Sequence, residues 1–202
     1  MLMDYIWSQK ALYWIIQYCI IQYMKDVILK FDDYLHEHNL KFSSIIIGGS
    51  ALIVLGVIDR STQDVDCLFP IIPSDIKEAS IAFAKKQNKK EIVIKEDWLN
   101  NGPEDLARDL PKGWQVRTQT IFKGKAIHLE TLGRNDLLLS KLFAYVDRQQ
   151  DLDDCIALRP TEKELSDSIN WLVARDTNDK WESHVRKSIQ LLAKKLGYNA
   201  YK

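Results

Sequence analysis

Two short apolar segments, one ending and one beginning in a polar motif, constrain the fold of this chain most. The β-branched run at residues 44–47 stops at GGS (48–50), and the apolar run at residues 64–69 opens with DVD. Short apolar runs bounded by turn residues are typical of buried strands. Between them, ALIVLG (51–56) predicts a short helix ended by glycine. The sequence thus predicts a strand, a helix and a strand, with polar motifs at the strand ends.

The two carboxylates of the second strand predict a metal site. Asp64 and Asp66 are two residues apart, so they project from one strand face with Cα atoms roughly 6.5–7 Å apart. Two like charges this close are unfavourable unless a cation lies between them. Magnesium takes carboxylate oxygens and leaves positions for phosphate and water. We therefore expect Asp64 and Asp66 to bind Mg²⁺.

The glycine motif predicts a phosphate site beside these acids. Gly48 and Gly49 let the backbone approach a polyphosphate closely, and the Ser50 hydroxyl and nearby N–H groups can donate to it. Arg60 and Thr62 precede the second strand and can reach a phosphate, although a simple turn contact is an alternative. Gly-Gly alone is often a turn and Asp-x-Asp alone a solvated strand edge, so the joint pattern carries the prediction.

The strand, GGS, the spacer of residues 51–63 and the Asp-x-Asp strand together resemble the polymerase-beta-like nucleotidyltransferase superfamily. The resemblance implies an α+β fold with a mixed sheet flanked by helices, a nucleoside triphosphate (NTP) as substrate, and Mg²⁺ as cofactor. It also implies a third catalytic carboxylate on a later strand. Glu130, which shares a strand face with His128, is the candidate. The superfamily more often uses Asp there, and a solvent-facing Glu on an edge hairpin is the alternative.

From residue 133 onward the signals are helical. We expect helices at residues 136–148 and 151–158, a third after a capping box at residues 161–164, and a fourth at residues 179–196. Gly197 is the expected stop of the last helix.

Residues 135–158 are similar to the C-terminal motif of minimal nucleotidyltransferase families that include AbiE-type bacterial toxins. Those carry a helical Lys, an Arg seven residues on, and Asp-x-x-Asp. By this resemblance Lys141 contacts the nucleotide phosphates, and Arg148, on the same helix face, is a second nucleotide-binding candidate. Alternatively Arg148, Asp151 and Asp154 form a structural ion-pair and capping network, which we favour for Asp154. The resemblance also suggests an antitoxin partner.

The chain divides into three predicted segments: an apolar helical extension (1–23), a nucleotidyltransferase core (24–132) and a helical C-terminal subdomain (133–202). The most apolar run, at residues 11–24, has 14 residues and two glutamines, against the ~20 that a membrane span needs. It lacks the basic region and cleavage site of a signal peptide. Met24, which opens an amphipathic helix, is an alternative natural start.

The middle of the chain gives weaker signals. Ser74 predicts the N-cap of a helix at residues 75–87, and residues 89–95 suggest a strand. Residues 98–114 predict loops around a short helical stretch. Residues 114–122 and 125–131 predict a hairpin.

In the predicted loop at residues 98–114, Trp98 and Asn100 are candidates for stacking on a base and reading its edge, respectively. For Trp98, a place in the core under the loop is the alternative that we favour.

Composition excludes several classes of protein. The chain has 28 basic and 28 acidic residues, so its net charge gives no support for a surface built around nucleic acid. Residues 85–125 are locally basic, which suits an RNA acceptor but also an ordinary solvated surface. The three cysteines are too scattered for a disulfide framework, and the four histidines have no metal-ligand spacing. We expect a reducing, cytoplasmic location and no membrane association.

The sequence therefore predicts an enzyme, a Mg²⁺-dependent nucleotidyltransferase acting from an NTP on an acceptor that it does not identify: RNA, protein or a small molecule. The alternative is a catalytically silent nucleotide-binding or interaction module on the same fold.

Overall fold

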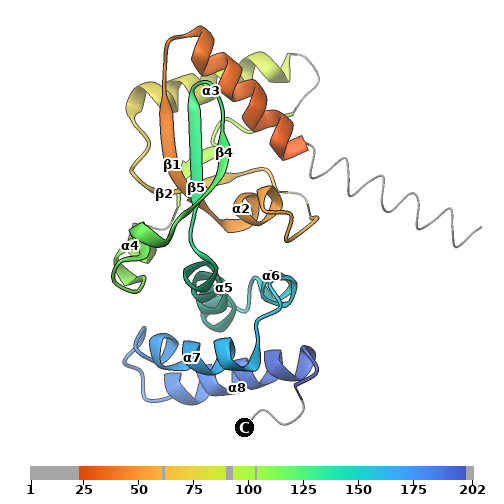
Figure 1. Ribbon diagram of the computed structural model, residues 1–202, viewed down its shortest axis with the longest axis vertical. Coiled ribbons are helices and arrows are strands. Elements are labelled where there is room, and N and C mark those ends of the chain that lie inside the picture. The colour runs from red at the N-terminus through yellow and green to blue at the C-terminus, as the bar shows by residue number, and fades with distance from the viewer. Residues whose placement is uncertain (1–22, 61, 90–92, 103, 199–202) are drawn as a thin grey trace, which may run out of the picture. The chain divides into compact units, whose positions relative to one another are not determined.

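The computed structural model describes residues 23–60, 62–89, 93–102 and 104–198. The chain forms two compact units (Figure 1). The sheet unit comprises the described residues up to Gly102 together with Thr120–Thr131, and the helical unit comprises residues 104–119 and the chain from Leu132 onward. The predicted extension at residues 1–23 lies outside the described residues except for Tyr23, which begins a helix.

The sheet unit is built on a five-stranded mixed sheet in the order β3-β2-β1-β5-β4. Strand β1 pairs antiparallel with β2 and parallel with β5, and β2 pairs parallel with β3. The mixed sheet, its helices and the helical C-terminal part confirm the predicted α+β class. The strands are β1 (Phe42–Ile47), β2 (Val65–Phe69), β3 (Leu99–Asn101), β4 (Gln119–Lys123) and β5 (Ile127–Thr131).

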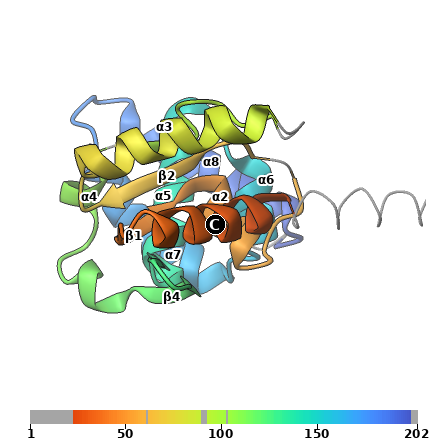
Figure 2. The same cartoon turned by 90° about the horizontal axis from the view of Figure 1, so that it is seen from above.

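One face of this sheet is apolar and covered by helices. The helix of residues 23–37 and α3 (Ser74–Asn88) lie side by side in Figure 2. They meet through Phe31 and Phe83, whose ring centroids are 5.2 Å apart, and Trp98 completes the cluster at 5.1 Å from Phe31. Trp98 is buried and donates its indole N–H to the carbonyl of Ser80. The core position that we favoured for Trp98 is therefore confirmed.

The same helix is fastened to the sheet through a buried carboxylate. Asp32 accepts hydrogen bonds from the backbone N–H groups of Lys125, Ala126 and Ile127, at 2.7–2.9 Å. Burial raises the pKa of this carboxyl, but the three N–H donors outweigh that effect and leave the pKa below its usual value. A side chain at Gly124 would collide with the Asp32 carboxylate. The β4–β5 turn therefore fits the helix in two ways: its N–H groups bind the Asp32 carboxylate, and Gly124 leaves room for that carboxylate.

The helical unit contains five α-helices and a 3-10 turn in its described residues. The predicted capping box is present: Thr161 accepts from the Glu164 N–H, and Glu164 accepts from the Thr161 N–H. The last helix ends at Lys195, and the predicted stop Gly197, whose φ is 89°, follows the C-cap residue Leu196. The elements are α4 (Glu104–Asp109), η1 (Trp114–Arg117), α5 (Arg134–Arg148), α6 (Leu152–Ala157), α7 (Glu162–Val173) and α8 (Trp181–Lys195).

Three local predictions are wrong. Residues 114–117 form a 3-10 turn instead of a strand, because Trp114 is buried and donates to the Ala107 carbonyl. Residues 99–101 pair with β2 instead of forming a loop. Ser74 is the first helical residue, and Pro73 takes the N-cap position.

The strand expected at residues 89–95 is partly outside the described residues. Residues 90–92 are not described, and residues 93–95 have no strand conformation. The hairpin predicted at residues 114–131 is present in shorter form, as β4 and β5.

Candidate functional site

The close approach of Asp66 to the backbone of Gly48 defines the site. Gly48 follows the last residue of β1 and begins α2 (Gly48–Val54) with φ of 76°, a conformation that favours glycine. A Cβ atom at Gly48 would lie 2.5 Å from the Asp66 Oδ2 atom. The missing side chain therefore makes room for the carboxylate, and the GGS and DVD motifs meet in space as the sequence predicts.

The second glycine is adjacent to two phosphate-binding types of side chain. A Cβ at Gly49 would lie 3.3 Å from the Arg60 Nη2 atom and 3.4 Å from the Thr62 hydroxyl. A guanidinium and a hydroxyl are common donors to phosphate oxygens. The structure thus brings together Gly48, Gly49, Arg60, Thr62 and Asp66.

Ser50 contributes to this turn in a different way from the one its sequence position suggested. Its side chain is fully buried, and its hydroxyl donates to the Ile47 carbonyl at 3.2 Å. The bond joins the last residue of β1 to the first turn of α2. In this structure the hydroxyl supports the glycine turn from inside.

The sheet register identifies the polar neighbours of Asp66. Asp66 is opposite Asn100 on β3 and opposite Ile47 on β1. Residues opposite each other across a ladder project from the same face. The buried face of the sheet carries Val65, whereas the other face carries Asp66 and Asn100. Asn100 is therefore the polar side chain nearest to Asp66 along the sheet on the β3 side.

The predicted third acid lies farther away. Glu130 is opposite Ile45 on β1, so β1 separates it from Asp66, and the two positions are offset by two residues. Neighbouring strands are ~4.8 Å apart, which puts the Cα atoms of Glu130 and Asp66 about 10 Å apart or more. Glu130 shares the face of Asp66 but is not its neighbour. The sequence singled out Asn100 only as a loop residue that could read a base. Its place beside Asp66 had no signal in the sequence, because β3 is only three residues long.

The acidic groups suit a metal bound by few protein ligands. Asp64, just before β2, is partly exposed and lies 3.8 Å from the Lys95 ammonium group. Within the described residues, no group of three or more His, Cys, Asp or Glu side chains is arranged to hold a metal ion. Mg²⁺ is commonly held by one or two carboxylates and completed by water and substrate phosphate. Asp64 and Asp66, beside a glycine turn that leaves space for the carboxylate, fit that donor set.

The other two predicted nucleotide-binding residues belong to the helical unit. Lys141 is buried on α5, and its ammonium group lies 3.1 Å from Asp151 Oδ2 and 2.7 Å from Asp154 Oδ2. Arg148, at the end of α5, is exposed and 3.8 Å from the Asp147 carboxylate. Lys141 thus joins α5 to α6 through two ion pairs. Asp154 is part of an ion-pair network, as we favoured, but its cation is Lys141, whereas the predicted partner Arg148 lies beside Asp147.

The cysteines of the described chain are not nucleophiles at neutral pH. Cys67 on β2 and Cys155 on α6 are both buried. Burial raises the pKa of each thiol to about 12, so the thiolate is scarcely populated.

One comparison with known proteins identifies the family of this chain. The family model described as "nucleotidyltransferase of unknown function (DUF6036)" matches residues 23–196, and the chain therefore belongs to that family. No curated protein and no solved structure matches the chain. Among the described helices, none has the length and apolar character to cross a membrane.

Proposed function

We propose that this member of the nucleotidyltransferase family transfers a nucleotidyl group from an NTP in a Mg²⁺-dependent reaction at the glycine turn after β1. The observation that carries the proposal is the meeting of the Asp66 carboxylate with Gly48 and of Arg60 and Thr62 with Gly49. A carboxylate suited to a metal and donors suited to phosphate therefore lie against two consecutive glycines. A triphosphate with its Mg²⁺ requires that combination.

In the proposed reaction, an acceptor oxygen bonds to the α-phosphorus and the bond to the leaving pyrophosphate breaks. The acceptor proton passes to a base. Family resemblance assigns that part to Glu130, which lies on the face of Asp66 but across β1, so the acceptor would have to extend over β1 to reach it. Asp64 and Asp66 would hold Mg²⁺, which would supply positive charge to the phosphates. Arg60 and Thr62 bind and orient the phosphate oxygens, since a guanidinium donates in a fixed geometry.

A silent nucleotide-binding module is the second candidate function. The observation that favours it is the register of the sheet, which puts the amide of Asn100 opposite Asp66 and puts Glu130 across β1. An amide binds a divalent cation more weakly than a carboxylate does. Such a site binds an NTP with Mg²⁺ and turns it over slowly or not at all.

The proposal also concerns the acceptor of the nucleotidyl group and the biological role of the protein. The similarity of residues 135–158 to AbiE-type toxins favours an RNA or protein acceptor and an antitoxin partner. A small-molecule acceptor is the third class. Transfer of label from each α-labelled NTP to RNA, to protein or to neither assigns the acceptor class directly.

The first experiment is thermal unfolding with each NTP, with and without Mg²⁺. Ligand at 100 times its Kd adds about 2.7 kcal/mol to the free energy of unfolding, a shift of several degrees in Tm for this chain length. We expect a Mg²⁺-dependent shift that the double variant Asp64→Asn/Asp66→Asn loses.

The matched control is Asp153→Asn, which removes an exposed carboxylate from α6 in the helical unit and keeps the shift. A shift without label transfer to any acceptor selects the silent module. The absence of a shift with every NTP, in a folded protein, refutes both candidates.

A further inference from the structure

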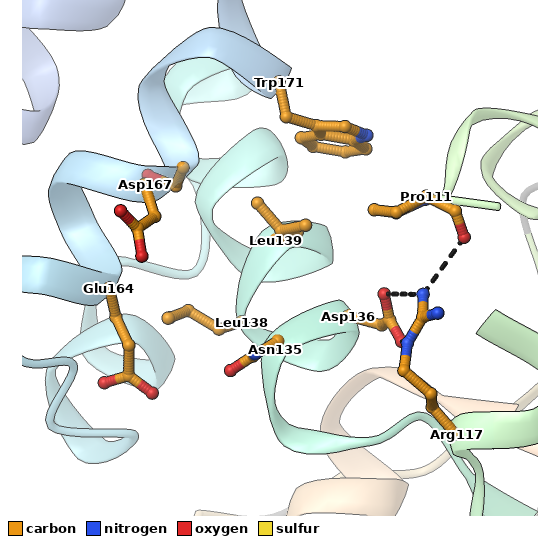
Figure 3. A pocket seen from close by; sticks show the side chains of 10 residues that line it. Pro111, Arg117, Asn135, Asp136, Leu138, Leu139, Glu164, Asp167 and Trp171 are labelled. Atoms are coloured by element: carbon orange, nitrogen blue, oxygen red, sulfur yellow. Dashed lines mark hydrogen bonds and ion pairs between the residues drawn. The ribbon is translucent and has the colours of Figure 1, made fainter. Parts of the chain in front are cut away.

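The helical unit contains a pocket that the proposed function does not use. Its volume is about 370 Å³, within the ~300–1,000 Å³ of small-molecule sites. Its walls are α5, α7 and the segment between α4 and β4, all within the helical unit. Figure 3 shows Glu164 and Asp167 on one side, Arg117 and Asp136 on the other, and Leu138 and Leu139 between them.

The apolar part of the pocket consists of two leucines and one indole ring. Leu138 and Leu139 line it from α5, and Trp171 lines it from α7 (Figure 3). The Trp171 ring is held by a hydrogen bond from its N–H to the Asp109 carbonyl and by the edge of Phe143, with centroids 6.2 Å apart. A fixed aromatic and aliphatic surface favours a ligand with a flat or apolar body.

Arg117, the basic residue among those that line the pocket, is paired with Asp136, which also lines it. Arg117 Nε and Nη2 donate to the two oxygens of Asp136, at 2.8 and 2.9 Å. Its remaining guanidinium contacts are to the carbonyls of Pro111 and Lys112, at 3.1 and 3.0 Å. Four donor contacts are therefore used inside the protein, and the pair leaves little positive charge for an anionic ligand.

The opposite wall is acidic. Glu164 and Asp167 line the pocket, whereas their basic partners Arg134 and Lys163 do not. The hydrogen bond from Arg134 holds the pKa of Glu164 at about 2, so this carboxylate stays charged. Asp167 contacts Lys163 through Oδ2, at 2.7 Å. Both carboxylates are therefore paired with cations outside the lining. The Lys163–Asp167 pair is exposed, at 83% and 64%, and such pairs are weak in water, so Asp167 can exchange its partner for the ammonium group of a ligand.

We propose that this pocket binds a small organic amine, protonated at neutral pH, whose flat or apolar body lies on Leu138, Leu139 and Trp171. Its ammonium group faces Asp167 and Glu164. Carboxylates and an indole ring both favour a cation over a neutral or anionic group. Arg175 already lies 4.8 Å from the Trp171 centroid, and it does not line the pocket. The proposal is independent of the nucleotide site, because phosphates would face carboxylates here.

Three probes of the same shape test the charge preference: tryptamine, its neutral alcohol tryptophol, and indole-3-propionate. The readout is the ¹⁵N–¹H resonance of the Trp171 indole in the full chain, assigned with Trp171→Phe. We expect saturable shifts with tryptamine at a Kd at least tenfold below that of tryptophol, a difference of about 1.4 kcal/mol. Indole-3-propionate should give no saturable shift.

Two variants on one helix test the position of the ammonium group. Asp167→Asn should raise the Kd of tryptamine several-fold and leave that of tryptophol unchanged. Glu162→Gln removes an exposed α7 carboxylate that does not line the pocket, and both Kd values should stay unchanged. Equal affinities for the three probes, no saturable shift with tryptamine, or no effect of Asp167→Asn would each overturn the proposal.

Discussion

Asp66 and Asp154 are both motif aspartates, yet their surroundings differ in kind. Asp66 is half-buried on β2 and lies against the backbone of a glycine. Asp154 is 1% exposed and lies 2.7 Å from the Lys141 ammonium group, which is itself buried. The comparison teaches that an acidic motif indicates a ligand site only where a ligand can contact its carboxylates. A carboxylate paired with a buried lysine contributes to stability instead.

The largest loss of stability should come from breaking the buried ion pairs of Lys141 with Asp151 and Asp154. Lys141→Met keeps the length of the side chain but leaves the Asp154 carboxylate buried with its principal cation gone. Removal of one partner of a buried ion pair costs about 3–5 kcal/mol. Urea denaturation should show a loss of this size, whereas Asp66→Asn should change the free energy of unfolding by less than about 1 kcal/mol.

The double variant Lys141→Met/Asp154→Leu is the control for the network, and it should recover part of the loss because neither charge remains. If Lys141→Met costs no more than Asp66→Asn, Lys141 is not structural. Its assignment as a phosphate-binding residue would then regain support.

The second effect tests the close approach at the glycine turn. Gly48→Ala puts a Cβ at positive φ and 2.5 Å from the Asp66 carboxylate, so the loss of stability should be about 2 kcal/mol. The Mg²⁺-dependent shift with NTP should disappear as well, because the carboxylate must move.

Gly56→Ala is the matched control for that variant. Its φ is also positive, 73°, but a Cβ there would have no atom within 4 Å. It should therefore show the backbone cost of about 1 kcal/mol alone and keep the response to nucleotide. Equal behaviour of the two variants would remove the argument that Gly48 accommodates Asp66.

The smallest expected effect is a pH dependence of the free energy of unfolding, caused by Glu164 in the helical unit. The hydrogen bond from Arg134 lowers the pKa of Glu164 from 4.5 to about 2. A lowered folded-state pKa contributes stability above pH 4.5, and that contribution is lost as the pH falls through about 2. Glu164→Gln should thus cost about 1 kcal/mol at pH 7. The gap between wild type and variant should narrow between pH 4.5 and 2.

Urea midpoints at several pH values measure this gap for Glu164→Gln, and Glu162→Gln is the comparison on the same helix. Glu162 is exposed in the first turn of α7, and it takes no part in the capping box. A gap that stays constant down to pH 2 would show that the charge of Glu164 contributes no stability.

The best sequence predictions concern short-range features. The strand at residues 44–47, the glycine turn and the DVD strand are near one another in the chain, and local hydrophobicity identifies them. The capping box at Thr161 and the stop at Gly197 are local hydrogen-bond and dihedral requirements for which few residue types are suitable. The contact of Asp66 with the glycines was also predicted, because a short helix and loop join the two strands.

The misses depend on contacts between distant residues. Leu99–Asn101 has no strand signal of its own and becomes β3 only because β2 offers an edge. Trp114 lies in a 3-10 turn instead of the predicted strand because its side chain is buried and donates a hydrogen bond to the Ala107 carbonyl. The phosphate-binding role of Lys141 stays a prediction, and the ion pairs of this residue with Asp151 and Asp154 are a further feature that its spacing along the helix does not indicate.

The sequence by itself determined the α+β class, the two strands with their polar ends and the meeting of the Gly48 and Asp66 motifs, because local hydrophobic pattern and glycine conformation suffice for these. Only the tertiary structure decided which polar groups become neighbours of Asp66. Strand order put Asn100 opposite it on β3 and left Glu130 across β1. The reason is physical: side-chain type and spacing are properties of the chain, whereas adjacency across a sheet follows from which backbone edges pair.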